Sequence, residues 1–402
     1  MPKKRTAVGT HAELSVKLST RGAARLQARH PWVYRSDIEG IEANDIPPGS
    51  VVRVFDPRGK FLGTALYSSS SQIAIRMISH GSVADLPALV ADRIRAAIAY
   101  RKELVANTDA YRIVFSEADF LPGLIVDRYH DVISLQILTQ AIDAAPVRDA
   151  IVKTLREEVQ PAGIVERVDG RIRELEQLPP RQSGLLWGDK SSTQIEMNGV
   201  HFHYDGLEGQ KTGAFLDQRE NYAAAAQYAH GEALDVFCYQ GGFALHLAAK
   251  CTSVTGVDSS RPALEVAEKN AALNGRELEW IEGNAFDLLR EYAAAEHRYD
   301  TIVLDPPPFA KTKRDLDKAL CGYKELNLRA LKMLRPGGIL VTCSCSFHVG
   351  AQDFLAVVAD AARDAHKDLR VVENRGASKD HPILLNVPET SYLKCLILSV
   401  SN

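Results

Sequence analysis

ALDVFCYQGGFALHLA, residues 233–248, places an apolar run before a glycine pair and an apolar helical period after it. The same order recurs through the C-terminal half, in SVTGVD (253–258), LEWIEG (278–283), DTIVLDPPPF (300–309) and GGILVTCSC (337–345), each followed by a helical stretch. YLKCLILSV (392–400) then reads as one more strand. Such alternation predicts an α/β Rossmann-like fold with a mainly parallel sheet covered on both faces.

Outward from this core, the 402 residues exceed what one hydrophobic core usually supports, so two or three domains are expected. We predict a β-rich domain over 13–84, an α+β middle domain over 85–205, and the α/β domain over 206–402. The first holds VVRVF and FLGTALY joined by DPRGK as a hairpin. The second holds an amphipathic helix over 84–105 and a hairpin around Asn198 and Gly199.

Charge and cysteine usage narrow the class of protein. Lys and Arg number 48 against 51 acids, and the net charge of −3 excludes a wholly basic nucleic-acid-binding protein. The six cysteines show no CxxC pair, which is typical of a reducing, cytoplasmic compartment without structural zinc or another bound metal. No apolar run reaches the roughly 20 residues needed to span a membrane, so we expect no membrane association.

A local basic cluster lies near the N-terminus despite the acidic total. Lys17, Arg21, Arg25 and Arg29 follow one another at four-residue spacing and could neutralise phosphates of a nucleic acid. The alternative is a solvated face without a partner.

The residues after the first strand of the α/β domain predict a cofactor site, because ligands bind at the carboxyl ends of parallel strands. Gly241 and Gly242 permit a tight turn and close ligand approach. The dinucleotide pattern GxGxxG is absent, which disfavours a dehydrogenase. Asp235 beside the turn suits a ligand that carries an ammonium group.

The next two strand ends extend this site. Asp258 can accept hydrogen bonds from both hydroxyls of a ribose, although an Asp there could instead be a helix N-cap. Asn284 and Ala285 are placed to hold an adenine edge. Together these features indicate S-adenosylmethionine as the cofactor, and the remaining predicted cofactor-binding residues are Phe237, Tyr239 and Asp305.

The fourth and fifth strands predict the catalytic groups. Asp305 precedes three prolines that must lie beyond the strand end, where they form a rigid lip, and Phe309 is available to stack on a flat base. Cys343 and Cys345 alternate with serines at the neighbouring strand end. Free cysteine in a strand is most often a small buried hydrophobe, but the ligand edge favours a functional role.

These motifs resemble the bacterial large-subunit ribosomal RNA 5-methylcytosine methyltransferases that carry an N-terminal PUA domain. The resemblance spans nearly the whole chain, and its most specific parts are GQKTGAFLDQREN (209–221) followed by DPPPF. It implies a PUA-like RNA-binding domain, a middle domain and a class I methyltransferase domain. It also implies that Cys345 is the nucleophile, with Cys343 at a tolerant position. This sequence departs from relatives at two positions. Asn284 stands where relatives often have Asp, and Pro308 stands where the two-cysteine RNA cytosine methyltransferases place their second cysteine.

The resemblance implies methylation of a cytosine at carbon 5 through a covalent Cys345 adduct, with Asp305 steadying the base. Large-subunit ribosomal RNA is the expected partner, and a homodimer is allowed for. Two alternatives stay open: a related ribosomal RNA methyltransferase acting on a guanine ring nitrogen, which needs no thiol, and a noncatalytic RNA-binding relative.

Overall fold

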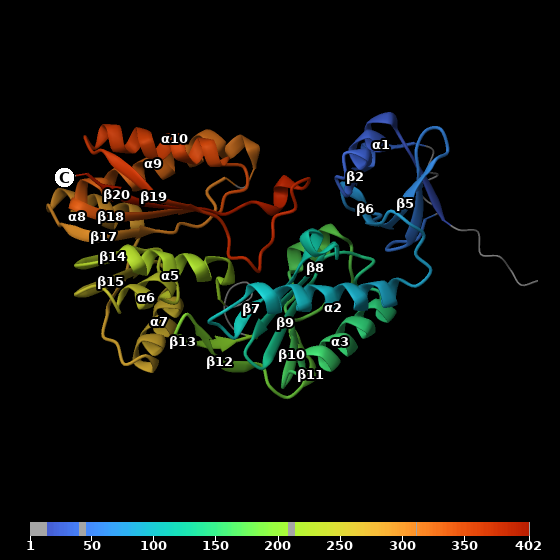
Figure 1. Ribbon diagram of the computed structural model, residues 1–402, viewed down its shortest axis with the longest axis horizontal. Coiled ribbons are helices and arrows are strands. Elements are labelled where there is room, and N and C mark those ends of the chain that lie inside the picture. The colour runs from blue at the N-terminus through green and yellow to red at the C-terminus, as the bar shows by residue number, and fades with distance from the viewer. Residues whose placement is uncertain (1–13, 40–45, 208–213, 311, 402) are drawn as a thin grey trace, which may run out of the picture.

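The computed structural model describes residues 14–39, 46–207, 214–310 and 312–401. Three main sheets succeed one another along the chain (Figure 1). In this view the N-terminal sheet lies at one end of the molecule, the seven-stranded C-terminal sheet at the other, and the middle sheet between them. The β-rich, α+β and α/β order is the one that the sequence predicts, whereas the boundaries at 84/85 and 205/206 stay a prediction.

The N-terminal part forms a six-stranded sheet in the order β2-β6-β5-β4-β1-β3. Its strands are β1 (Ser15–Leu18), β2 (Trp32–Tyr34), β3 (Ile38–Glu39), β4 (Val51–Phe55), β5 (Phe61–Tyr67) and β6 (Ile73–Ser79). The DPRGK turn joins the antiparallel β4 and β5, as predicted. Helix α1 (Thr20–Gln27) was not predicted. It carries Arg21 and Arg25 of the basic cluster, for which the sequence predicted a charged surface but no helix.

The middle part packs two long helices on a five-stranded sheet of order β11-β10-β9-β8-β7. Its elements are α2 (Leu86–Leu104), β7 (Ala110–Phe115), β8 (Leu124–Tyr129), β9 (Val132–Ile137), α3 (Ala145–Val159), β10 (Gly163–Glu166), α4 (Gly170–Leu175) and β11 (Gly184–Gly188). The hairpin of β12 (Ser192–Met197) and β13 (Val200–Asp205) follows. Its turn residues Asn198 and Gly199 have φ of 53° and 80°, the positive pair that a tight two-residue hairpin requires.

The C-terminal part is a seven-stranded sheet of order β16-β15-β14-β17-β18-β20-β19. Its strands are β14 (Glu232–Val236), β15 (Ser253–Asp258), β16 (Glu279–Glu282), β17 (Tyr299–Leu304), β18 (Leu334–Ser344), β19 (Leu369–Arg375) and β20 (Lys394–Val400). The first five run parallel to one another, and β20 lies antiparallel between β18 and β19. Edge strand β19 was not predicted, because its exposed Val371 and Val372 stand among charged residues.

Helices cover both faces of this sheet, which explains its apolar strands. One face carries α8 (Ala285–Ala294), α9 (Leu316–Met333) and α10 (Ala351–Asp364), and the other carries α5 (Arg219–Tyr228) and α6 (Gly242–Leu247) (Figure 1). Alternate residues of β17 pack on opposite faces of the sheet. Ile302 and Leu304 belong to the apolar core beneath α8, α9 and α10, and Val303 belongs to the core beneath α5 and α6. Since both faces are filled, ligands can reach the sheet only at its strand ends.

Candidate active site

A cavity of about 450 Å³ lies at the carboxyl ends of the parallel strands. Its wall includes Asp258 at the end of β15, Asp305 after β17 and Cys345 after β18, together with Gln218 and Tyr392 from outside the sheet. Tyr239 and Gln240 also line a more polar cleft of about 1020 Å³ beside β12, β13 and α7 (Arg261–Leu273). The smaller cavity is the candidate active site because its wall brings the Cys345 thiol together with the Asp258 and Asp305 carboxylates at the strand ends.

The turn after β14 has an unusual backbone. Phe237, Tyr239 and Gly241 have φ of 67°, 51° and 86°, and two of these three residues carry side chains that disfavour such values. A Cβ on Gly242 would lie 2.5 Å from the ring of Tyr222, so only glycine fits there. Strained backbone of this kind persists where surrounding structure holds it, often at ligand sites.

Asp235 lies at the end of β14 behind this turn and is fully buried. Its Oδ2 accepts a hydrogen bond from the backbone N–H of Ala244 at 2.8 Å, while Oδ1 has no hydrogen-bond partner among the described residues. Burial, together with the smaller effect of the negative charges of Asp305 and Asp258, raises the pKa of Asp235 to about 8 against the hydrogen bond from Ala244, which lowers it. A buried carboxylate with an unused oxygen fits the ammonium group of an amino-acid-bearing cofactor.

Asp258 faces the cavity from the end of β15. Its Oδ2 accepts from the N–H of Tyr239 and its Oδ1 from the N–H of Ser260, each at 2.9 Å. The alternative interpretation as an N-cap is wrong, because Ser260 caps α7 with its own side chain. Two backbone donors hold the carboxylate in place, and its oxygens keep acceptor capacity for ribose hydroxyls.

Asn284 and Ala285 lie beyond the residues that line the cavity. The Asn284 side chain caps α8 by accepting from the N–H groups of Phe286 and Asp287 at 3.0 and 3.3 Å. Ala285 is buried in the apolar core. Contact of these two residues with an adenine edge stays a prediction. It would have to use their backbone groups or the Nδ2 side of the Asn284 amide, because Oδ1 caps α8.

Asp305 follows the last residue of β17, and the three prolines lie beyond the strand end, as predicted. Its Oδ1 accepts a hydrogen bond from Nε2 of Gln218 at 3.0 Å. Asn221 in turn donates from Nδ2 to Oε1 of Gln218 at 2.7 Å. The sequence pattern gave no role to Gln218 or Asn221, although both belong to the specific motif at 209–221. The first five residues of that motif lie outside the described part of the chain.

The two candidate cysteines have different environments. Cys345 is the first residue after β18, half-buried on the cavity wall, and its thiol donates to the carbonyl of Pro306 at 3.7 Å. Cys343 is fully buried opposite Cys395, and burial raises the pKa of its thiol well above the usual value. The structure therefore brings Cys345, and not Cys343, to the cavity beside Asp305.

A hydroxyl network fixes the proline lip to the segment that carries Cys345. Ser346 Oγ accepts from the N–H groups of Phe309 and Ala310 at 3.0 and 3.3 Å, and it lies 2.9 Å from the hydroxyl of Tyr323. The ring of Phe309 packs against Tyr323 and is outside the residues that line the cavity. Stacking of Phe309 on a substrate base stays a prediction and would require the ring to leave this contact.

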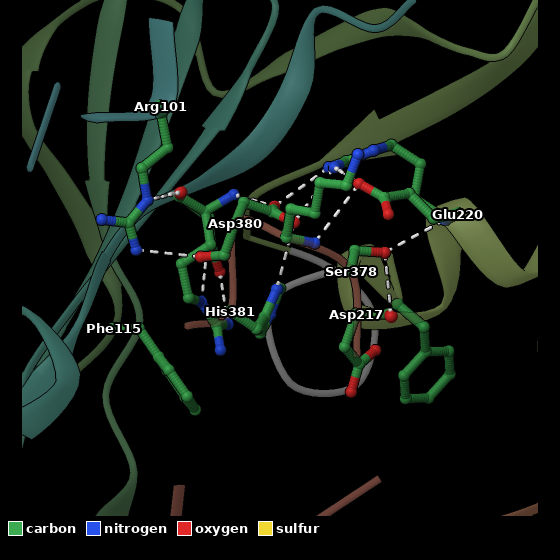
Figure 2. Close-up of polar contacts among 12 residues, drawn as sticks. Arg101, Phe115, Asp217, Glu220, Ser378, Asp380 and His381 are labelled. Atoms are coloured by element: carbon green, nitrogen blue, oxygen red, sulfur yellow. Dashed lines mark hydrogen bonds and ion pairs between the residues drawn. The ribbon is translucent and has the colours of Figure 1, made fainter. Parts of the chain in front are cut away.

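A buried ionic cluster joins the cavity wall to the middle sheet, and Figure 2 shows Asp380 at its centre. Arg219, which follows Gln218, donates to both carboxylate oxygens of Asp380 at 2.9 and 3.0 Å. Arg112 of β7 donates its backbone N–H to the same carboxylate, and Arg101 of α2 donates to the Asp380 carbonyl. Burial alone would raise the pKa of Asp380, but His381 and Arg219 hold it below its usual value.

The basic N-terminal residues are only partly free for a partner. Lys17 and Arg29 are exposed, whereas Arg21 forms an ion pair with the buried Asp37 at 2.5 Å. The guanidinium of Arg25 lies 4.6 Å from the ring centre of Tyr34. A role for these residues in substrate binding stays a prediction.

The chain matches two protein-family models. Residues 16–80 match a PUA-like domain and residues 150–398 match the S-adenosylmethionine-dependent methyltransferases. It is 38% identical to Ribosomal RNA large subunit methyltransferase I of Photobacterium profundum over 380 residues, which cover 92% of this chain and 95% of that protein. The protein of the same name from Shewanella denitrificans is 38% identical over 397 residues, with 96% and 99% covered.

Solved structures show the same fold. One, "a putative sam-dependent methyltransferase from Streptococcus mutans", has a TM-score of 0.81 at 19% identity and covers 96% of this chain and 100% of that one. Another, "a putative methyltransferase complexed with SAH", has a TM-score of 0.82 at 19% identity and the same coverage. S-adenosylmethionine is the cofactor of this family, as predicted from Asp235, Asp258 and the glycine turn. Within the described ranges, no helix combines the length and apolar character that a membrane crossing needs.

Proposed function

The chain belongs to the S-adenosylmethionine-dependent methyltransferases, and from this membership we propose that it methylates carbon 5 of a cytosine in large-subunit ribosomal RNA. The names of its full-length relatives support the RNA substrate. The position of Cys345 supports the choice of base and atom, because carbon 5 of cytosine is a poor nucleophile until a thiolate adds at carbon 6.

In the proposed reaction, the Cys345 thiolate forms a bond to carbon 6, and the electrons of the carbon 5–carbon 6 double bond become available at carbon 5. S-adenosylmethionine, held by Asp258, would supply the electrophilic methyl group to carbon 5, with the bond from that methyl to sulfur breaking to leave S-adenosylhomocysteine. Removal of the carbon 5 proton by a base restores the double bond and expels the Cys345 thiolate. Once the base passes this proton to solvent water, the enzyme is back in the state in which it began.

Two carboxylates support this chemistry from the cavity wall. Asp305 is held by Gln218 and would accept a hydrogen bond from the exocyclic amino group of cytosine, steadying its N3 and amino edge. Asp258, held by two backbone N–H groups, would accept from the ribose of the cofactor. Each side chain is positioned before the ligands arrive, which limits the ordering needed on binding.

The single observation that carries the proposal is the presence of Cys345 on the same cavity wall as Asp305 and Asp258. Methylation of a guanine ring nitrogen requires no thiol at that position. A noncatalytic RNA-binding relative requires neither the thiol nor Asp305.

RNA that carries 5-fluorocytosine at the target position tests the mechanism. Fluorine cannot leave as a cation, so the wild-type enzyme should accumulate a methylated RNA adduct that survives denaturation and maps by mass spectrometry to Cys345. The Cys345→Ala variant should form no adduct, and Cys343→Ala should form it normally. An adduct on Cys343 contradicts the assignment of Cys345 as the nucleophile, and the absence of any adduct with a substrate that is methylated when unfluorinated contradicts the thiol mechanism.

We further propose that the PUA-like residues and the basic cluster bind the RNA backbone. Replacing Arg25 and Arg29 together with Ala should make the slope of log affinity against log salt shallower by about 1 to 2, since each phosphate contact contributes about 0.7 to 0.9. Arg363→Ala, at an exposed arginine paired with Asp360 on α10 and outside the basic cluster, is the control and should leave the slope unchanged. An unchanged slope in the double variant would contradict RNA binding by these residues and favour the alternative of a solvated face without a partner.

A further inference from the structure

Lys394 is a buried lysine at the start of β20, and its residue is only 8% exposed. It lies opposite Ser344 in the pairing of β18 with β20. Its Nζ donates hydrogen bonds to the carbonyl of Ser346 at 2.7 Å and to that of Tyr392 at 2.8 Å. The ammonium therefore contacts Ser346, the residue that follows Cys345, while the backbone of Lys394 pairs with Ser344, the residue that precedes it.

This lysine has no ion-pair partner among the carboxylates of the described chain. Buried charges in proteins are usually paired, as Arg219 is with Asp380 and Arg101 with Asp119. Two carbonyl oxygens satisfy two of its three N–H groups but supply no negative charge. A structural ion pair therefore does not explain why the chain buries a cation here.

The other titratable groups around Cys345 either oppose a thiolate there or stay neutral. Asp305 and Asp217 lie on the cavity wall and their charges would disfavour another anion. Burial raises the pKa of Tyr323 and, more strongly, of Tyr392, so both phenols stay neutral at neutral pH. Arg112 also lies near Tyr392 and Asp217 but is paired with Asp127, which leaves Lys394, among the described residues around Cys345, as the cation without a carboxylate partner that favours ionisation of the thiol.

Electrostatics couples the two groups directly. Burial lowers the pKa of Lys394 to about 8, and the negative charge of an ionised Cys345 opposes that shift. The coupling is reciprocal, so an ammonium at this position favours the thiolate form of Cys345. Arg375 is a cation on the neighbouring strand β19, but it forms an ion pair with Glu373 and donates a hydrogen bond to Asn221.

We propose that Lys394 is a positioning residue whose buried ammonium, anchored on the Ser346 and Tyr392 carbonyls, holds Cys345 as a reactive thiolate. The S–H bond breaks with its electron pair left on sulfur, and the proton passes to solvent water. The proposal rests on the nucleophilic role of Cys345 stated above. It assigns to β20 a part in the chemistry although its strand residues lie outside the residues that line the cavity.

The test is the pH dependence of alkylation, which requires neither RNA nor methyl transfer. The full-length protein is treated with iodoacetamide at a series of pH values, and mass spectrometry follows the peptide that contains Cys345. The exposed Cys321 in the same sample provides an internal reference thiol. We expect the midpoint for Cys345 to lie at least one pH unit below that of Cys321.

Variants then separate charge from packing. Lys394→Met keeps the length of the side chain and removes the charge, so the midpoint for Cys345 should rise by one unit or more, with about tenfold slower alkylation at pH 7. Lys394→Arg should retain the low midpoint. Lys190→Met, at a lysine paired with Asp131 in the middle part of the chain, is the matched control and should leave the curve unchanged.

Two outcomes would overturn the proposal. A wild-type midpoint for Cys345 at or above that of Cys321 does so without any variant, even if Lys394→Met fails to fold. An unchanged midpoint in folded Lys394→Met does so as well. A low, Lys394-dependent midpoint without a 5-fluorocytosine adduct would instead contradict the proposed function and leave the assignment of Lys394 intact.

Discussion

The two halves of the ligand edge are built in different ways. On the cofactor side, Asp258 is held by backbone N–H groups of Tyr239 and Ser260, within 20 residues of chain. On the catalytic side, Asp305 is held by Gln218, 87 residues away. Ser346, the neighbour of Cys345, likewise contacts Tyr323 of α9 and Lys394 of β20.

The difference shows which parts of an active site local sequence can encode. A strand, a tight turn and a helix place the cofactor groups with little help from elsewhere. The catalytic groups depend on a lip, a helix and a returning strand that meet only after folding. Perturbing distant contacts should therefore damage the catalytic half and leave the cofactor half nearly intact.

The largest effect should come from the two cysteines, which lie two residues apart on opposite sides of the strand end. Cys345→Ala should reduce methyl transfer by more than about 10³-fold while leaving affinity for S-adenosylmethionine nearly unchanged, because the lost bond exists only along the reaction path. Cys343→Ala should keep activity and lose about 1–2 kcal/mol of unfolding free energy by leaving a small cavity in the core. Single-turnover kinetics and denaturant titration measure both. Residual turnover by Cys345→Ala would move the nucleophile elsewhere.

The next effect concerns the buried cluster that anchors the catalytic side. Asp380→Ala should destabilise the protein by about 3–5 kcal/mol, because it leaves Arg219 buried without its partner. Asp360→Ala, at a half-exposed carboxylate paired with the exposed Arg363, is the control and should change stability by less than about 1 kcal/mol. A loss for Asp380→Ala no greater than for the control would contradict the cluster's role as an anchor.

The same group gives a pH dependence. The pKa of Asp380 is lower in the folded state than its usual value, so its stabilising contribution is present above an unfolded pKa of about 3.9. That contribution should be lost as the pH falls from this value through the lower folded pKa. Wild-type unfolding free energy should accordingly fall more steeply with acid than that of Asp380→Ala, as measured by urea titration between about pH 5 and 2.

A smaller effect tests the cofactor side. Asp258→Ala should weaken binding of S-adenosylmethionine by about 1.5–3 kcal/mol, roughly 10- to 100-fold in Kd, through loss of hydrogen bonds to a charged acceptor. Stability should change much less than in Asp380→Ala. Isothermal titration calorimetry of the folded variant provides the measurement. Unchanged affinity would remove Asp258 from the cofactor site.

The smallest effect concerns the long-range contact between Gln218 and Asp305 on the catalytic side. Gln218→Met should lower kcat by about fivefold, or about 1 kcal/mol, because Asp305 loses one donor that water can partly replace. Affinity for S-adenosylmethionine should stay within twofold. Gln227→Met, at an exposed glutamine of α5, is the matched control. Equal losses of kcat and cofactor affinity in Gln218→Met would show that the two halves are not independent.

The sequence by itself determined the order of strands and helices in the α/β part, because buried parallel strands and amphipathic helices leave distinct apolar periods. It also located Asp235, Asp258 and the glycine turn, since each follows a strand within a few residues. Asp305 was found for the same reason. The sequence did not predict helix α1, which is short and polar, or strand β19, which is an exposed edge strand.

Only the tertiary structure decided what surrounds the reactive groups. Cys343 and Cys345 share the two-residue period of a strand, so local pattern alone places both on one face. The end of β18 at Ser344 separates them, burying one and exposing the other to the cavity. Gln218, Tyr323 and Lys394 reach the site from elements far away in the chain, and no local period records that meeting, because packing between distant elements creates it.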